Sequence, residues 1–111
     1  RINNHGAPVF RVSANRIELQ ARLAAREALR YSPAGIPILP ASLQHESMQF
    51  EAGSQRKVEL EIAAVFAGRL AEIANRAPLG AGMQVSGFLA PKRRSSKQLV
   101  LHVTEFELIE V

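Results

Sequence analysis

Hydrophobic and polar side chains alternate along three stretches of the chain, which is the pattern of a β-strand with one buried face. Residues 17–23 carry Ile, Leu, Ala and Leu at every second position, with Glu, Gln and Arg between them. Residues 57–62 and 99–103 alternate in the same way. Residues 17–30 are also rich in Ala, Leu, Glu and Arg, whose intrinsic propensity favours a helix. Because the period of two is clear at the start of this stretch, we predict a strand there.

Turn-forming residues separate the predicted strands. Proline and glycine within residues 31–37 indicate a turn, and a strand is predicted over residues 38–50. Pro40 in this strand indicates an edge position or a bulge, because proline cannot donate to a central ladder. Residues 51–55 predict a hairpin connection into the alternating stretch 57–62, whose apolar side chains we expect to be buried.

A short amphipathic helix is predicted after the third strand. Phe66, Leu70 and Ile73 recur at spacings of four and three residues, which places them on one apolar face. Glu72 and Arg76 lie four residues apart on the other side, which is the spacing of an intrahelical ion pair. The proline and glycine that follow end the helix.

Two more strands complete the pattern. Residues 82–91 resume strand character, with Phe88 on the face opposite to the apolar residues before it. After residues 99–103 the alternation changes phase, which predicts a bulge near Thr104. Three strands, one short helix and two strands are the order of the five-stranded OB-fold barrel, an all-β fold with one short helix. In that fold, the face of the second and third strands and the loops after the first and fourth strands bind oligomers.

The composition indicates one folded domain. The chain has 111 residues, 47% of them hydrophobic, which suits a single domain with its own core. We predict that the domain covers residues 15–111. Residues 1–14 show neither period and are interpreted as a tail, vector remnant or upstream extension, with a native start hidden before Arg1. The sequence contains no cysteine, which excludes disulfides, a thiolate nucleophile and cysteine-ligated zinc.

The net positive charge lies in one short segment. The chain carries 14 Lys and Arg against 10 acidic residues, a formal net charge of +4. Residues 92–97 hold four of the bases and no acid, so the rest of the chain is balanced. Focused charge attracts polyanions, although an ordinary solvated loop is the plainer interpretation. The position of the segment, in the loop after the fourth predicted strand, favours polyanion binding.

The sequence contains no catalytic, metal-binding or membrane-spanning pattern. The chain has no Asp, which excludes a Ser-His-Asp triad, and neighbours in His45-Glu46-Ser47 point to opposite faces of a strand. The three histidines are too scattered to indicate a metal site. The longest uncharged stretch, residues 77–91, is shorter than the ~20 residues of a membrane helix. We therefore predict a cytoplasmic binding domain with no cofactor and no enzymatic activity.

Six short stretches form an ordered set along the chain. They are Ser32–Pro37, His45–Ser47, Glu51–Gly53, Gly87–Leu89, Val100–His102 and Glu107–Glu110. Together they resemble the bacterial primosomal replication protein N (PriB) family, over a region from about Asn15 to the C-terminus. Membership implies a homodimeric OB-fold barrel, related to the single-stranded DNA-binding protein, that binds single-stranded DNA. It also implies a nucleoid-associated role with the PriA helicase and DnaT in restarting stalled replication forks.

The resemblance also implies where DNA binds. Carried over by position, the family's DNA face lies just before the first turn, on the hairpin of the second and third strands, and in the loop after the fourth strand. The basic residues there are Arg30, Arg56, Lys57, Lys92, Arg93, Arg94 and Lys97. Tyr31 and Phe50 lie beside the two nearest turns and are candidates for base stacking, with burial as the alternative. Glu46 and Glu59 depart from the family, in which some members carry an arginine and a tryptophan at these positions.

Two other functions fit the same sequence features. One is a protein-interaction OB module whose basic loop contacts an acidic protein partner. The other is an RNA-binding OB domain, which differs from a DNA-binding one by a 2′-hydroxyl contact that the sequence does not reveal. Binding to a labelled oligothymidylate at two salt concentrations separates the first alternative from binding to single-stranded DNA.

Overall fold

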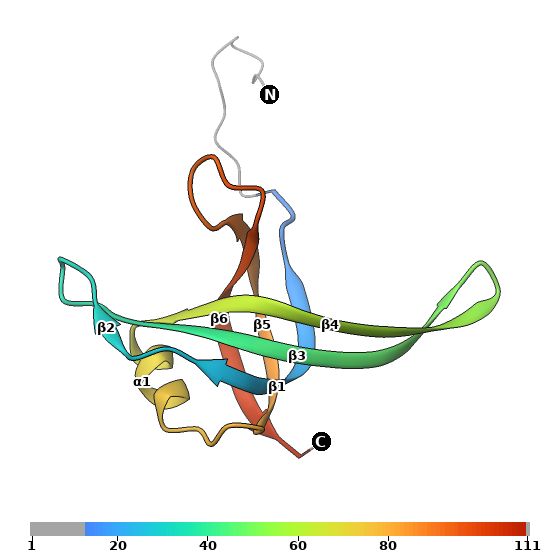
Figure 1. Cartoon of the computed structure of the whole chain (residues 1–111), viewed down its shortest axis with the longest axis horizontal. Coiled ribbons are helices and arrows are strands. Elements are labelled where there is room, and N and C mark those ends of the chain that lie inside the picture. The colour runs from blue at the N-terminus through green and yellow to red at the C-terminus, as the bar shows by residue number, and fades with distance from the viewer. Residues whose placement is uncertain (1–12, 111) are drawn as a thin grey trace, which may run out of the picture.

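Residues 13–110 are described by the computed structural model, and their five long strands wrap into one barrel (Figure 1). The elements, in chain order, are β1 (Ile17–Arg26), β2 (Arg30–Tyr31), β3 (Pro37–Glu51), β4 (Ser54–Ala67), α1 (Arg69–Asn75), β5 (Gly82–Pro91) and β6 (Leu99–Ile109). This order confirms the predicted OB fold and the strand at the start of residues 17–30. β2 was not predicted, because a strand of two residues shows no periodicity.

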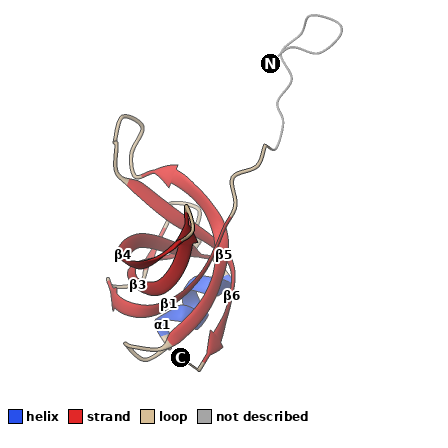
Figure 2. Ribbon diagram, turned by 90° about the vertical axis from the view of Figure 1, so that its right-hand side faces the viewer, coloured by secondary structure: helices blue, strands red, loops and turns tan. Residues whose placement is uncertain are grey.

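One continuous ladder closes the barrel. β1 pairs with β5, β5 with β6, β6 with β4 and β4 with β3, and β3 pairs again with β1. The β4–β6 pair is parallel, and the other pairs of long strands are antiparallel. Figure 2 shows α1 at the end of the barrel away from the β5–β6 loop, where it contacts β3, β4 and β6.

Side chains from every long strand fill the barrel. The largest fully buried ones are Leu23, Leu39, Leu43, Phe66, Met83, Val85 and Leu101. Phe66 meets Phe106 edge-to-face, with 5.2 Å between the ring centroids and 76° between the ring planes. The quadrupoles of aromatic rings favour this arrangement. Burial of these apolar side chains is the main driving force for folding.

The predicted apolar face of the helix is correct only for Leu70, which packs against the core. Phe66 belongs to β4 and Ile73 is 39% exposed, and the residues that α1 buries are Ala71 and Ala74. Small side chains let α1 pack closely against the end of the barrel, so the available space decides which residues face inward. Glu72 and Arg76, both within the described residues, form no ion pair, and Arg76 is the C-cap beyond the last helical residue.

β3 and β4 form a hairpin that extends beyond the barrel (Figure 1). Their register is unbroken up to the pair Glu51–Ser54. The turn residues Ala52 and Gly53 have φ values of 51° and 80°, as the tight turn of a hairpin requires. β1 pairs with β3 only as far as Gln44, so the outer part of the hairpin has no neighbouring strand on that side.

One prediction about this hairpin is wrong. Val58 is only half-buried and Leu60 is 38% exposed, because both lie on the part of β4 that extends past the barrel. The predicted edge position of Pro40 holds locally. Pro40 is opposite Val65 of β4, and neither β1 nor β2 pairs with it on the other side. The carbonyl of Pro40 accepts a 2.9 Å hydrogen bond from the backbone N–H of Glu27. The missing N–H of the proline therefore faces the loop after β1, where no strand needs a donor.

The predicted bulge is confirmed at Thr104. The register between β5 and β6 shifts after Ser86, which leaves Thr104 without a partner in β5. The next residue of β5, Gly87, lies so close to β6 that an added Cβ would be 1.9 Å from the carbonyl oxygen of His102. Only glycine fits this position, and the close approach brings Phe88 over His102.

The predicted tail falls mostly on residues 1–12, which lie outside the described residues. Asn15, the first residue of the predicted domain, bonds through its side-chain amide to both backbone groups of Leu89, at 2.8 and 2.9 Å. These two hydrogen bonds attach the start of that domain to β5. Within residues 13–110, no helix has the length and the apolar character that crossing a membrane requires.

We predict that Gly87→Ala destabilises the fold more than Gly80→Ala does. The new Cβ at residue 87 meets backbone atoms of β6, whereas nothing lies within 4 Å of the Cβ position at Gly80, which has a φ of 88°. Overpacking against backbone costs roughly 3 kcal/mol, at the upper end of measured values, and a left-handed alanine costs about 1 kcal/mol. Urea unfolding followed by circular dichroism measures both. Equal losses in the free energy of unfolding would contradict the close approach of β5 and β6.

Candidate nucleic-acid interface

A groove of ≈ 250 Å³ lies on the outer side of the barrel, beside the start of the β5–β6 loop. Arg30 of β2 and Lys92 of the loop both line this groove, and so does the acidic Glu27. Its other lining residues are Pro40, Ala41, Ala63, Ala64, Val65, Val100 and His102. The groove therefore combines the loop after the first long strand, the hairpin strands and the loop after the fourth long strand, which is where OB folds bind oligomers.

The floor of the groove continues into a row of side chains that crosses four strands. Pro40 of β3 is opposite Val65 of β4, which is beside His102 of β6. His102 is in turn opposite Phe88 of β5 and stacks flat on it, with 5.0 Å between the ring centroids and 3° between the planes. His102 is the member of this row that carries polar side-chain atoms. Neither of its ring nitrogens has a hydrogen-bond partner among residues 13–110.

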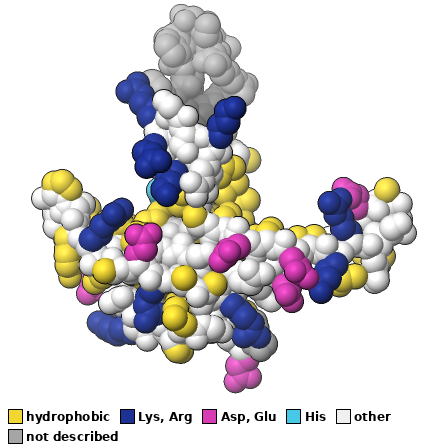
Figure 3. All heavy atoms as spheres, in the orientation of Figure 1, with side chains coloured by type: hydrophobic (Ala, Val, Ile, Leu, Met, Phe, Trp, Pro, Cys, Tyr) yellow, Lys and Arg dark blue, Asp and Glu magenta, His cyan; other side chains and the backbone are white. Residues whose placement is uncertain are grey.

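The β5–β6 loop carries four exposed cations. They are Lys92, Arg93, Arg94 and Lys97. None of them forms an ion pair with an acidic side chain of residues 13–110. A 2.8 Å hydrogen bond from the backbone N–H of Lys92 to the carbonyl of Gln98 closes the neck of the loop. Figure 3 shows the Lys and Arg side chains gathered around this loop at the top of the molecule.

The two cations of the hairpin are paired with acids. The Nη1 atom of Arg56 lies 2.9 Å from Oε1 of Glu51, and Nζ of Lys57 lies 2.9 Å from Oε1 of Glu59. The hydrogen bond to Glu59 and the charge of Glu59, with a smaller effect of Glu46, raise the pKa of Lys57. Exposed pairs of this kind add little stability. Each acid nevertheless cancels the charge that its partner would present to a polyanion.

The outer face of the hairpin is acidic between the barrel and its tip. Glu46 and Glu59 are directly opposite each other in the β3–β4 register, and Glu61 follows opposite Gln44. Like charges in opposite positions repel each other, and Lys57 on the same face offsets part of this repulsion. Figure 3 shows acidic side chains spread along the hairpin, separate from the cations of the loop. A polyanion held at the loop is therefore repelled along this surface.

The structure separates the predicted site residues into two groups. Arg30 and Lys92 line the groove, whereas Phe50, Arg56 and Lys57 lie toward the hairpin tip. Tyr31 follows Arg30 in β2, and the other three cations share the loop of Lys92. Tyr31 is 64% exposed and Phe50 75% exposed, so neither ring is buried in the barrel. Both therefore remain available for stacking on a base.

Sequence reasoning missed Phe88 and His102 as residues of the interface. Alternation along β6 places His102 between the buried Leu101 and Val103, so its side chain faces outward. The same alternation turns Phe88 outward, as predicted, and the ring is 40% exposed. The outward phase of both residues was visible in the sequence, but their stacking depends on the register of β5 and β6.

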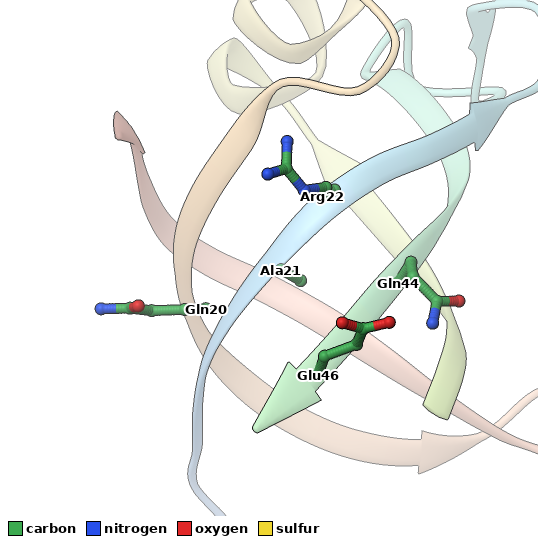
Figure 4. Close-up of a pocket in the computed structure, with 5 residues that line it drawn as sticks. All are labelled: Gln20, Ala21, Arg22, Gln44 and Glu46. Atoms are coloured by element: carbon green, nitrogen blue, oxygen red, sulfur yellow. The ribbon is translucent and has the colours of Figure 1, made fainter. Parts of the chain in front are cut away.

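A second hollow, of ≈ 290 Å³, lies where β3 diverges from β1 (Figure 4). Its lining residues are Gln20, Ala21, Arg22, Gln44 and Glu46. The guanidinium of Arg22 donates a 3.2 Å hydrogen bond to the carbonyl of Gly80 in the loop before β5. The polar lining groups are two neutral amides and two opposite charges, so this hollow offers no concentrated charge.

His45 and Ser47 share one face of β3 and are hydrogen-bonded to each other. The Nε2 atom of His45 lies 2.8 Å from Oγ of Ser47, and its Nδ1 lies 2.6 Å from the carbonyl oxygen of Gln20. A backbone carbonyl occupies the position of the carboxylate in a hydrolase triad, and Glu46 belongs to the opposite face. The contact ties the hairpin to β1. No group of three or more His, Cys, Asp or Glu within the described residues could hold a metal ion.

Comparisons with known proteins agree with this geometry. Residues 15–105 match the model of a family described as "Another single-strand binding protein family". The chain is 48% identical over 91 residues to the replication restart protein PriB of Bordetella pertussis, covering 82% of this chain and 85% of that protein. The structure of PriB from Ralstonia solanacearum has a TM-score of 0.80 and 38% identity, covering 88% of this chain and 100% of that one. The single-stranded DNA binding protein of Thermus aquaticus, with a TM-score of 0.69 and 24% identity over 87% of this chain and 50% of its own, shares the fold.

A closed OB barrel with a basic loop beside an outer groove is the architecture of single-strand-binding proteins, and the family model matches the chain to that class. Within this class, the chain belongs to the PriB family of replication restart proteins. The resemblance found in the sequence is thereby confirmed.

We predict that Glu59→Gln lowers the pKa of Lys57 toward its ordinary value. The substitution removes the carboxylate whose hydrogen bond and charge raise that pKa. Glu51→Gln is the matched control, because Glu51 pairs with Arg56 instead. An NMR titration of the Lys57 side chain measures both variants, and an unchanged pKa in Glu59→Gln would contradict the pairing. The small stabilisation by this pair is present below the pKa of an unfolded lysine and is lost as pH rises through the folded-state pKa.

Proposed function

We propose that this chain binds single-stranded DNA and takes part in the restart of DNA replication. The observation that carries the proposal is the β5–β6 loop, whose four exposed cations have no acidic partner within residues 13–110. Phosphates that contact such cations release condensed counterions, which supplies affinity independent of sequence. The relatives named replication restart protein PriB support the cellular role.

The groove and the loop provide the principal DNA contacts in this proposal. The phosphate ligands are Arg30, Lys92, Arg93, Arg94 and Lys97. Tyr31, next to Arg30 in β2, offers an exposed ring on which any base can stack, an interaction worth ~1–3 kcal/mol. Arg56, Lys57 and Phe50 extend the surface at the hairpin tip. The first two contribute less, because an acid is already paired with each.

The proposed role in restart is that of a binding protein at the nucleoid. The chain holds the exposed single strand and contacts the PriA helicase and DnaT. Support for the role in restart comes from family membership. PriA and DnaT are proposed as partners because the sequence resembles the PriB family.

A homodimer is the proposed functional unit. Residues 17–21 of β1 pair with β5 on one side and, among the described residues, with no strand on the other, which leaves an open sheet edge. An open edge of this kind is a template for pairing with another chain. One carbonyl group of this edge, that of Gln20, already has the imidazole of His45 as its hydrogen-bond partner. Two joined copies would present two basic loops to one DNA strand and would raise its affinity through effective concentration.

We predict that replacing Lys92, Arg93, Arg94 and Lys97 together with alanine flattens the salt dependence of DNA binding. Each lost phosphate contact reduces the slope of log affinity against log salt by about 0.7 on single strands. Stability should hardly change, because all four side chains are exposed. Fluorescence anisotropy of a labelled oligothymidylate over a series of salt concentrations measures the slope.

The double variant Arg56→Ala with Lys57→Ala is the control for this experiment. We expect a smaller change of slope for each side chain removed, because both cations are paired with acids. An unchanged slope in the fourfold variant would exclude the loop as the DNA interface. Absent binding to oligothymidylate would favour the acidic protein partner. Tighter binding of oligouridylate would favour the RNA-binding alternative.

We predict that the chain sediments as a dimer at micromolar concentration, with about twice the monomer mass of 12.1 kDa. Glu18→Pro should weaken the dimer. The backbone N–H of Glu18 faces the open edge, on the same side as the Gln20 carbonyl that contacts His45, and proline cannot donate to a ladder there. Glu18→Ala is the control, because it removes the same side chain and keeps the backbone N–H. A species of monomer mass alone in the unchanged chain would contradict the prediction.

A further inference from the structure

His102 is the ionisable side chain that the long strands contribute to the groove. The other residues of the long strands that line it are Pro40, Ala41, Ala63, Ala64, Val65 and Val100, none of which ionises. Phe88 covers one face of the half-buried imidazole, and both ring nitrogens are without a partner among the described residues. His45 differs from His102, because its Nδ1 contacts the carbonyl oxygen of Gln20 and its Nε2 contacts Oγ of Ser47, both at hydrogen-bond distance.

The charged groups around His102 suit a phosphate. Arg30 of β2 and Lys92 of the loop line the same groove, and Glu27, after β1, is the acid among the lining residues. Beyond Phe88, Arg16 lines a neighbouring hollow and is paired with Glu18. A phosphate attracted by the two groove cations therefore arrives beside an imidazole whose nitrogens have no hydrogen-bond partner within residues 13–110.

The protonation state of the imidazole changes what it can offer to that phosphate. A neutral imidazole has one N–H donor and no charge, whereas the protonated ring has two donors and a positive charge. Hydrogen bonds between charged partners are shorter and stronger than neutral ones. The protonated ring therefore binds phosphate more tightly, and by linkage the binding of phosphate takes up protons. Stacking on Phe88 restricts the ring beforehand, which lowers the entropy lost on binding.

We propose that His102 is a proton-dependent phosphate ligand, through which the chain binds single-stranded DNA more tightly as pH falls from about 8 to about 6. This inference rests on the proposed function, because it assumes that DNA occupies the groove. A half-exposed charge pair is worth up to about 1 kcal/mol. We therefore expect a gain in affinity of about fivefold across this range, with uptake of less than one proton for each groove occupied.

The test compares four proteins at constant ionic strength, at about pH 6, 7 and 8. They are the unchanged chain, His102→Gln, His102→Lys and the control His45→Gln. The probe is an oligothymidylate with a rhodamine label, because neither thymine nor this dye titrates in the range. The unchanged chain and His45→Gln should show the fivefold gain. His102→Gln should bind weakly at every pH, and His102→Lys should bind tightly at every pH, because its charge is fixed.

NMR of the histidine side chains provides a measurement that needs no variant. Addition of oligothymidylate at about pH 7 should move the His102 imidazole signals toward those of the protonated ring and leave His45 unchanged. Equal pH dependence in His102→Gln and in the unchanged chain would overturn the inference, and so would binding that is independent of pH. In both of these results the DNA still binds, and the proposed function stands. Absence of binding at every pH would overturn the proposed function and this inference with it.

Discussion

The double pairing of β3 is the constraint on which the rest of the structure depends. β3 is hydrogen-bonded to β4 along its whole length and to β1 from Ala41 to Gln44, and this second contact closes the barrel. Closure removes open edges from the middle of the sheet and assigns the inner face of β3 to Leu39 and Leu43. Past Gln44 the partner on one side is lost. The remaining part of the hairpin then leaves the barrel, with polar and charged residues on its outer face.

The charged side chains of the hairpin and those of the β5–β6 loop are arranged differently. On the hairpin, acids and bases of neighbouring positions pair with one another, as Lys57 does with Glu59, and the surface presents little net positive charge. The loop between β5 and β6 lies outside the ladder, so its cations have no cross-strand acid to pair with. The positive charge is thereby concentrated on the loop, beside a groove with a largely apolar floor. In the proposed function, phosphate attraction at the loop and base contact on the strands would act on the same strand of DNA.

Periodicity predicted the strands because each strand of the barrel has one buried and one exposed face. The change of phase at Thr104 was readable for the same reason, since a bulge turns every later side chain to the other face. The sequence pattern did not predict which side chains of the hairpin are buried. Leu60 alternates in the sequence like a core residue, but its burial depends on whether another strand covers it. The helix was also mispredicted in its buried face, because Ala71 and Ala74 were selected by the space beneath them.

The sequence by itself determined the order of the elements, the excess of positive charge in one loop and the outward phase of residues such as His102. These properties are local, since they depend on periodicity and composition within a few residues. Only the tertiary structure decided which of these residues meet. Arg30 and Lys92 come to line one groove, and Phe88 comes to stack on His102, through the closure of the barrel and the register of its strands. The physical reason is that strand pairing joins positions far apart in the chain, and no local pattern encodes which side chains will then be neighbours.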